Sequence, residues 1–277
     1  MSKKHAVSAV LLWSTVASAF KLSLRYLTPP QLLFYASLTS LILFGVLYSW
    51  EFSLRKENLR SAYLGLINPL LYYTVLFSAY DRLPAQEAQA LNYTWPIMLV
   101  LLSIPLLGRK PGARTILGLL TGFLGAIVVA TRGNLTGMSF SDPLGVALGL
   151  GSAVIWSAYW LLNLRDRRPL VEKMFWNFLF GFVYVSAVLL ISGGFIVPPV
   201  KDLAGAVYVG LFEMGVTFLL WYRAVESDMA FASNLAYLVP FLSLFFISVV
   251  VGETIAPSTV LGLVMIVVGI IIGRENR

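Results

Sequence analysis

Apolar segments about 20 residues long recur along nearly the whole chain, with short breaks between them. An apolar helix of about 20 residues spans the hydrocarbon core of a bilayer, so each segment is a candidate membrane span. Ten such helices would occupy about 200 of the 277 residues and leave no room for a separate soluble domain. We expect the spans at residues 5–24, 30–50, 60–79, 85–107, 112–130, 143–163, 173–193, 202–222, 230–250 and 257–273.

The composition agrees with a membrane protein and excludes several other classes. Hydrophobic residues make up 58% of the chain and charged residues 12%, and a soluble fold of this size cannot hide that much apolar surface. The chain has no cysteine and only one histidine, His5, which excludes disulfides, thiolate metal sites and Ser-His-Asp catalysis. A Gly-rich phosphate loop is also missing from the sequence. We therefore expect no metal, no cofactor, no enzymatic activity and no ATP-driven pumping by this chain alone.

The basic residues gather on one side of the predicted membrane. Of the 20 Lys and Arg residues, 15 fall on the side that holds the N-terminus. Positively charged loops stay in the cytoplasm, so both termini are predicted to be cytoplasmic, which requires an even number of spans. The net charge of +7 is spread over short connections, which argues against nucleic-acid binding. The other basic residues, on the opposite side, are Lys21, Arg25, Arg82, Arg132 and Lys201.

The chain repeats itself at a nearly constant offset. We expect two halves, residues 1–134 and 135–277, with five helices each, so that the second half enters the membrane upside down relative to the first. In secondary transporters such inverted halves enclose a site near the bilayer midplane. The ordered matches are Trp13-Ser14 with Trp156-Ser157, Tyr63-Leu64-Gly65-Leu66 with Tyr208-Val209-Gly210-Leu211, Tyr93 and Pro96 with Tyr237 and Pro240, and Gly108, Gly118 and Gly125 with Gly252, Gly262 and Gly269.

Further features accompany the repeat: Trp-Ser in the first helix of each half, a proline in the fourth and ninth helices, and Gly252-Glu253 before the last helix. Together these resemble the drug/metabolite transporter superfamily, in its EamA-type exporter branch. The stretch 92–96, Asn-Tyr-Thr-Trp-Pro, is most similar to the YddG-type exporters of aromatic amino acids. The resemblance implies an all-α bundle with a central cavity, lined by helices 1, 3, 4, 6, 8 and 9. We expect a multi-pass protein of the plasma (inner) membrane of a bacterium or archaeon, as a monomer or weak homodimer.

Polar residues inside the spans cost roughly 2.5–3.5 kcal/mol each when charged and are the first candidates for function. Glu213 lies near the middle of its span, and its repeat partner is Asn68. We interpret Glu213 as a coupling group that carries a proton, with a hydrogen-bonded structural carboxyl as the alternative. Lys21 and Glu87 lie at the outer ends of their spans. A pair between them would form an outer gate or bind a carboxylate or amine of the cargo, but snorkelling to the surface is the favoured interpretation.

Aromatic and amide side chains within the spans are predicted to bind the cargo. Aromatic rings stack on planar ligands and attract cations, while neutral amides suit both ends of a zwitterion. An interhelical hydrogen-bond seam is the alternative for the amides. The predicted set is Trp13, Asn68, Tyr72, Gln89, Asn92, Tyr93, Trp95, Trp156, Trp160, Asn234 and Tyr237.

These residues predict a secondary exporter of small, flat, amphipathic solutes, with an aromatic amino acid as the first choice. Export of other metabolites or of lipophilic cations is an alternative. A channel or facilitator is a further alternative, because inverted repeats also occur in some channels. The predicted partners are a small-molecule substrate and the lipid bilayer.

The predicted orientation can be tested with a reporter fused after Arg277. Because the basic residues favour the N-terminal side, the fusion should be active as a cytoplasmic reporter and inactive as an extracytoplasmic one. Activity on the outer side would contradict the orientation and the even number of spans.

Overall fold

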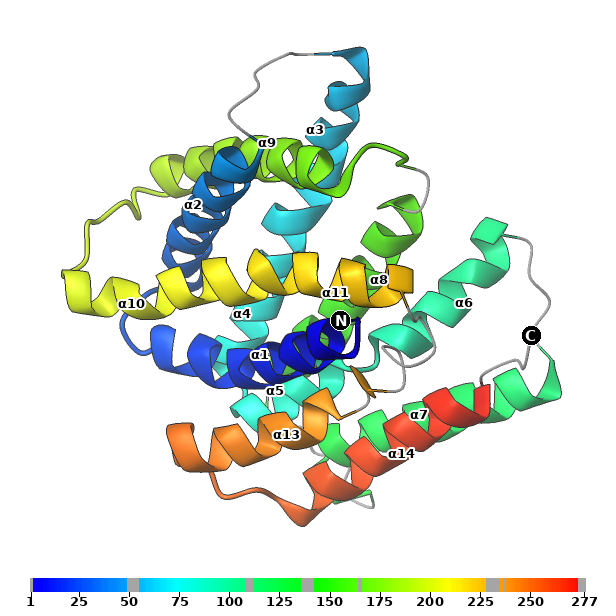
Figure 1. The fold of residues 1–277 in the computed structure, drawn as a ribbon. Coiled ribbons are helices and arrows are strands. Elements are labelled where there is room, and N and C mark those ends of the chain that lie inside the picture. The colour runs from blue at the N-terminus through cyan, green and yellow to red at the C-terminus, as the bar shows by residue number, and fades with distance from the viewer. Residues whose placement is uncertain are drawn as a thin grey trace.

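The computed structural model describes residues 2–48, 55–107, 112–135, 142–163, 166–227, 235–236 and 238–273, and these form an assembly of helices (Figure 1). Within these ranges seven helical segments are long and apolar enough to cross a membrane, and Val239–Val251 and Pro257–Gly273 are shorter. The elements are α1 (Ser2–Ser23), α2 (Pro29–Leu47), η1 (Lys56–Leu59), α3 (Arg60–Gly65), η2 (Leu66–Leu71), α4 (Tyr72–Arg82), α5 (Ala85–Asn92), α6 (Trp95–Leu107), α7 (Ala113–Ala130), α8 (Pro143–Asn163), α9 (Leu170–Ile191), α10 (Val200–Tyr208), η3 (Val209–Glu213), α11 (Val216–Ser227), α13 (Val239–Phe246), η4 (Ile247–Val251) and α14 (Pro257–Gly273).

The fourth predicted span, 85–107, is divided into two helices. α5 ends at Asn92, and α6 begins at Trp95 after a turn. Pro96 is the second residue of α6, where the missing N–H of proline removes no helical hydrogen bond. Pro240 takes the same second place in α13. Each proline therefore marks the start of a helix, where the sequence pattern had predicted a span that runs through.

Two further interruptions fall on the repeat-matched pair Asn68 and Glu213. η2 and η3 are π-helical turns, and η3 ends at Glu213. Asn68 has a non-helical backbone (φ −144°, ψ 116°) and precedes Pro69, which has no N–H to donate. π-Helical turns are rare in proteins, and those that occur often lie at functional sites. The two halves thus depart from the α-helix at corresponding positions.

α7 and α14 lie side by side because glycines allow their backbones to approach closely (Figure 1). A Cβ atom on Gly118 would collide with the backbone of Gly269 and Gly273, and one on Gly125 would lie 2.5 Å from the carbonyl oxygen of Gly262. Small residues are the usual means of close helix packing in membranes. Exposed apolar side chains occupy the other face of α7; they are Ile116, Leu117, Leu120, Leu124 and Ile127.

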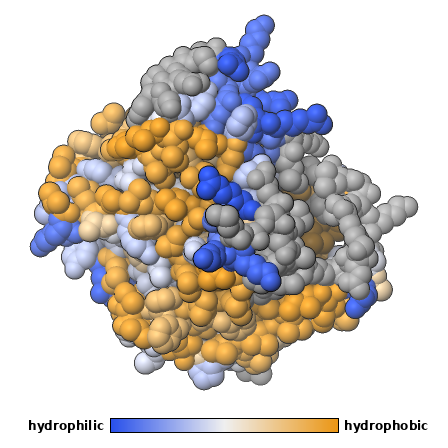
Figure 2. All heavy atoms as spheres, in the orientation of Figure 1, coloured by the Kyte–Doolittle hydropathy of each residue, from blue (hydrophilic) through white to orange (hydrophobic). Residues whose placement is uncertain are grey.

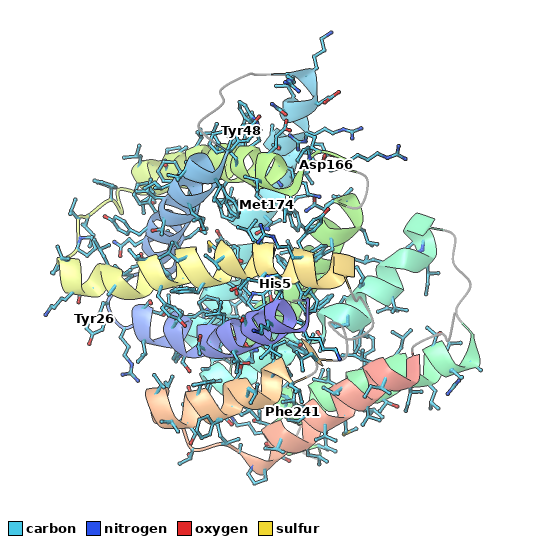
Figure 3. All side chains as sticks on the ribbon, viewed as in Figure 1. His5, Tyr26, Tyr48, Asp166, Met174 and Phe241 are labelled. Atoms are coloured by element: carbon cyan, nitrogen blue, oxygen red, sulfur yellow. The ribbon has the colours of Figure 1, made fainter. Side chains whose placement is uncertain are left out.

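The surface has the character expected of a protein in lipid. Figure 2 shows a broad apolar surface over the lower part of the view, with hydrophilic residues gathered near the start of α3. Figure 3 shows His5 near one end of α1 and Tyr26 beyond its other end. We call the membrane face at which α1 begins the N-terminal side and the face at which it ends the far side.

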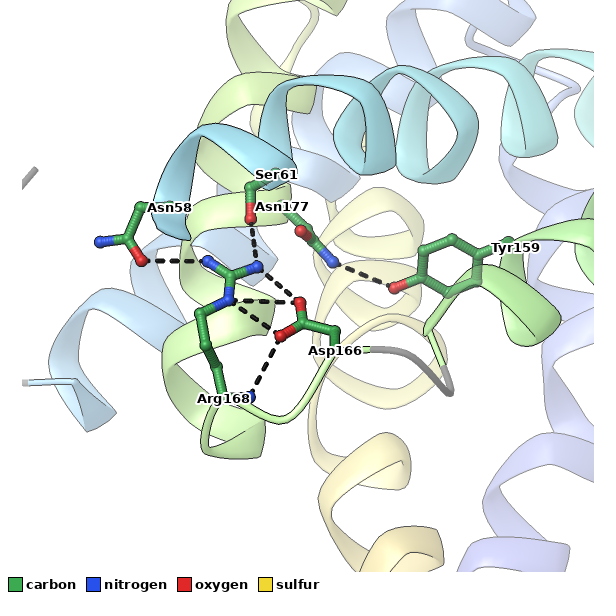
Figure 4. Close-up of polar contacts among 6 residues, drawn as sticks. All are labelled: Asn58, Ser61, Tyr159, Asp166, Arg168 and Asn177. Carbon is green, nitrogen blue, oxygen red and sulfur yellow. Dashed lines mark hydrogen bonds and ion pairs between the residues drawn. The ribbon is translucent and has the colours of Figure 1, made fainter. Parts of the chain in front are cut away.

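A buried ion pair connects the segment between α8 and α9 with η1 and α3 (Figure 4). The side chains of Arg168 and Asp166 are 7% and 3% exposed, with 2.6 Å between Nη2 and Oδ2. Arg168 also donates to Asn58 Oδ1 at 3.1 Å and to Ser61 Oγ at 2.9 Å. Burial alone would raise the pKa of Asp166, but hydrogen bonds from Arg168 outweigh it and hold this pKa below its ordinary value of 3.8.

Replacing Asp166 by Asn should destabilise the protein by roughly 3 kcal/mol, because the buried Arg168 guanidinium would lose its counter-charge. The folded pKa of Asp166 is depressed, so the wild-type contribution is fully present above pH about 4, the pKa of an unpaired aspartate, and is lost as the pH falls from there through the lower folded pKa. Thermal denaturation in detergent at pH 7 and at pH 3 measures both effects. Asp142→Asn, which removes an exposed pair with Arg82, is the control and should change little. Equal melting temperatures for both variants at pH 7 would contradict the interpretation.

Candidate binding cavity

A cavity lies among α1, α4, α5, α8 and α11, in the interior of the bundle. It encloses about 100 Å³, whereas small-molecule sites usually span about 300–1,000 Å³. The walls must therefore move apart before an amino acid or a larger solute fits. The lining residues are Trp13, Val16, Phe20, Tyr72, Leu76, Tyr80, Gln89, Asn92, Tyr93, Trp95, Trp156, Trp160, Glu213, Trp221, Ala236 and Val239.

Aromatic rings form much of the wall and contact one another around it. Tyr72 stacks on Trp156 with ring centroids 4.6 Å apart and planes inclined by 29°. Trp13 lies 5.2 Å from Trp221, centroid to centroid. Phe218 joins these two pairs through edge contacts with Trp13 at 6.2 Å and with Trp156 at 5.8 Å. The rings thus make a continuous network from α4 and α8 to α1 and α11.

Glu213 is the one acidic side chain among the described residues that line the cavity. It is 7% exposed and stands at the end of η3. The Tyr73 hydroxyl donates to its Oε1 at 3.2 Å. Its Oε2 is buried and has no hydrogen-bond partner in the described part of the chain. A carboxyl group with one vacant oxygen therefore borders an aromatic wall.

The two amides of α5 that line the cavity already have partners. Tyr80 donates to Gln89 Oε1 at 2.5 Å, and Gln89 Nε2 donates to Ser243 Oγ at 3.4 Å. Asn92 Nδ2 donates to Ser152 Oγ at 2.9 Å. These bonds link α5 to α4, α8 and α13. Gln89 and Asn92 therefore form an interhelical seam and border the cavity at the same time.

The structure brings most of the predicted cargo-binding residues to one cavity. Asn68 does not line the cavity and is buried in η2. η2 packs so closely against α9 that a Cβ atom on Gly181 would collide with the Pro69 ring. Asn234 and Tyr237 fall outside the described residues. The predicted residues that line the cavity are Trp13, Tyr72, Gln89, Asn92, Tyr93, Trp95, Trp156 and Trp160.

The candidate ion pair between Lys21 and Glu87 does not form, and each side chain has another partner. Lys21 Nζ donates to the carbonyl oxygens of Tyr80 and Leu83, at 2.7 and 2.8 Å. These carbonyls lie at the C-terminal end of α4, where carbonyl groups lack helical partners and attract a lysine. Glu87 pairs instead with Arg132, with 2.6 Å between Oε1 and Nε.

Hydrogen bonds tie the start of α5 to the segment that joins η4 to α14, on the far side. Glu253 Oε1 accepts the backbone N–H of Ala85 at 2.7 Å, so the carboxylate caps a helix N-terminus where N–H groups lack partners. Gln86 Nε2 donates to the Thr254 carbonyl at 2.9 Å, and Gln86 Oε1 accepts from the Ala256 N–H at 2.8 Å. We call these contacts, together with the Lys21 bonds and the Glu87 ion pair, the far-side seal.

A crevice of about 250 Å³ adjoins the cavity between α6 and the pair α7 and α14. It is lined by Thr115 near the start of α7 and by Gly273 at the end of α14, which places it on the N-terminal side. The crevice and the cavity share lining residues. The cavity thus has a neighbouring hollow on the N-terminal side and a hydrogen-bonded seal on the far side. The shared residues are Tyr93, Trp95, Trp221 and Ala236.

The family comparison decides the class of this protein. The model of the EamA-like transporter family matches residues 5–131 and 143–273. The chain belongs to the EamA-like transporter family. Because members of this family consist of two five-helix repeats, the expected all-α fold of ten spans around a cavity is confirmed. The division of the chain between residues 134 and 135 stays a prediction.

Named relatives agree with a transporter. The aromatic amino acid exporter YddG of Ancylobacter novellus is 27% identical over 267 residues, which cover 92% of this chain and 90% of the relative. A probable terminal-alkyne amino-acid exporter of Streptantibioticus cattleyicolor is 26% identical over 76% of this chain and 71% of its own. A crystal structure with a TM-score of 0.67 and 23% identity, covering 98% of this chain and 95% of that one, supports the fold. This EamA-like protein is therefore a multi-pass membrane transporter of small molecules.

Sequence reasoning missed Trp221, which lines both the cavity and the crevice of this EamA-like transporter. The signal was available, because Glu213, Thr217 and Trp221 are spaced at intervals of four residues, which predicts one shared face if the helix is continuous. Phe20 and Tyr80 were missed too. Both lie beside charged residues near the end of a predicted span, and the sequence does not show whether an aromatic residue there faces lipid or protein.

Replacing Glu253 by Ala should loosen the far-side seal. Loss of a helix cap costs about 1 kcal/mol, equivalent to about fivefold in an equilibrium. The chain contains no cysteine, so a single Phe20→Cys substitution reports access to the cavity wall. A membrane-impermeant thiol reagent should label this cysteine several-fold faster in the Glu253→Ala background.

Asp142→Asn is the matched control, because its exposed pair with Arg82 lies outside the seal. Equal labelling rates with and without Glu253→Ala would show that the Glu253 cap does not restrict access to the cavity.

Proposed function

We propose that this EamA-like transporter exports aromatic amino acids by alternating access. The observation that carries the proposal is the aromatic network around the cavity, in which Tyr72 stacks on Trp156 at 4.6 Å. Ring stacking favours planar aromatic ligands. The similarity to an aromatic amino acid exporter of Ancylobacter novellus supports the same class of cargo. Export of other metabolites or of lipophilic cations is the alternative.

In this proposal the N-terminal side faces the cytoplasm, as the distribution of basic residues predicts. Cargo enters through the crevice beside α6 and passes Tyr93, Trp95 and Trp221 to reach the cavity. The rings move apart to admit it, since the cavity holds only about 100 Å³. Release then requires the far-side seal to open while the N-terminal side closes.

Glu213 is the proposed coupling group of this cycle. Under alternating access, a carboxyl group on the cavity wall is exposed to each side of the membrane in turn. It can therefore take up a proton on one side and release it on the other. Lys21 and Glu87 are proposed to act in gating, because both belong to the far-side seal. Their role is to hold one end of the cavity closed.

The aromatic wall can be tested by substitution. A stacked ring contributes about 0.5–1.5 kcal/mol beyond its buried area, which is about two- to tenfold in binding. Trp95→Ala should therefore weaken export of phenylalanine and tryptophan by two- to tenfold and leave threonine export unchanged. Counterflow in reconstituted vesicles measures all three and also separates a saturable transporter from a channel.

Trp156→Phe keeps a ring at a buried position and should retain more activity than Trp156→Ala. Trp176→Phe is the control, because Trp176 packs against Phe175 at 5.5 Å and does not line the cavity. Equal loss for aromatic and non-aromatic substrates would mean that the rings only support the fold. No loss in any variant would place the binding site elsewhere.

A further inference from the structure

The carboxyl group of Glu213 is incompletely paired in either protonation state. As an anion it has one neutral donor, the Tyr73 hydroxyl at 3.2 Å from Oε1, which does not offset the loss of water around a buried charge. As a neutral acid it needs an acceptor for its proton, and Oε2 has no partner among the described residues. Buried polar groups in proteins are normally hydrogen-bonded. A partner from outside the chain would satisfy this oxygen.

The surroundings of Glu213 fit a cationic partner. Tyr73, which holds Oε1, contacts Tyr72 with ring centroids 4.6 Å apart, and Tyr72 stacks on Trp156. Contacts through Tyr73 and Tyr72 thus link the Glu213 carboxyl group to the Trp156 ring. Aromatic faces attract cations, and more strongly where water is excluded. A positively charged nitrogen beside Glu213 would meet both the carboxylate and the negative faces of the rings.

The cavity offers no comparable place for an anion. Of the described residues that line it, none is Lys, Arg or His. Its donors are neutral: Asn92 Nδ2 and Gln89 Nε2 each give one N–H to a serine, Ser152 and Ser243, and each amide nitrogen carries a second N–H. A carboxylate on the cargo would therefore meet neutral donors and no counter-charge, while an ammonium group would meet a carboxylate that has one vacant oxygen.

We infer that Glu213 binds the cationic nitrogen of the cargo, and that an aryl group joined to an ammonium group is the recognised unit. This inference rests on the proposed function and narrows its substrate class. Amino acids with aromatic side chains contain the unit, and so do arylalkylamines that have no carboxylate. The carboxylate of an amino acid is tolerated at this site and adds little to binding.

Equilibrium binding to the purified full chain, followed by tryptophan fluorescence, tests the inference. The probes share a phenyl ring: 2-phenylethylamine is a cation, phenylalanine a zwitterion, 3-phenylpropionate an anion and 3-phenylpropan-1-ol neutral. The wild-type protein should bind the amine at least as tightly as phenylalanine and more tightly than the anion. Glu213→Gln should weaken binding of the amine by about tenfold or more, because the ammonium group would face a neutral amide in place of a carboxylate. Binding of the alcohol should stay within twofold.

Tyr73→Phe is the matched control, because it removes the hydroxyl that contacts Glu213 and keeps the carboxylate. It should preserve the preference for the amine over the anion. Equal binding of amine and anion by the wild type, an equal loss for all four probes in Glu213→Gln, or no binding of the amine would overturn the inference. Failure to export phenylalanine, with amine binding still dependent on Glu213, would refute the proposed function and leave the inference standing.

Discussion

The bilayer interior offers no water to the backbone, so every break in a helix must find its hydrogen-bond partners within the protein. Side-chain hydroxyls meet this need where the helices of this chain are interrupted. Ser157 donates to the Trp95 carbonyl at 2.7 Å, beside the break between α5 and α6. Ser40 donates to the Gly210 carbonyl of η3 at 2.8 Å. At these two breaks a neighbouring helix supplies the donor, and the peripheral α2, α7, α9 and α14 run unbroken.

The matched helix breaks of the two halves carry side chains of different chemistry, and only one of them brings an ionisable group to the cavity. Asn68 in η2 is neutral and lies against α9, away from the cavity. Glu213 in η3 is acidic and lines the cavity. An inverted repeat supplies two equivalent places for an unusual backbone, and the side chain at each place decides its use. One wall therefore holds the ionisable group, while the facing helices contribute rings and amides.

Features of a single helix were predicted well from the sequence, whereas contacts that depend on how two helices are placed were predicted less well. The length of the apolar segments predicted the spans. Polar and aromatic residues that lie deep within those spans predicted most of the cavity wall. The pairing of Lys21 with Glu87 failed because it depends on which neighbours each side chain meets. Free carbonyls at the end of α4 reach Lys21, and Arg132 reaches Glu87. The periodicity of the sequence does not indicate which neighbouring groups compete for a side chain. The spacing of Trp221 from Glu213, by contrast, would have placed both residues on one face of a continuous helix.

The links at the two membrane sides differ in strength, and the difference suits a protein that opens on one side. The far-side seal consists mostly of separate hydrogen bonds, worth about 0.5–1.5 kcal/mol net between neutral groups and about 1.5–3 kcal/mol where Lys21 or Glu253 takes part. Its ion pair joins Arg132, whose side chain is 51% exposed, to Glu87, whose side chain is 4% exposed, so water reaches one partner of this pair. The Asp166–Arg168 pair on the N-terminal side is nearly completely buried, and breaking such a pair costs roughly 3–5 kcal/mol. Under the proposed alternating access, the far-side contacts can therefore separate while the α8–α9 connection stays fixed to α3 and provides the frame against which the other helices move.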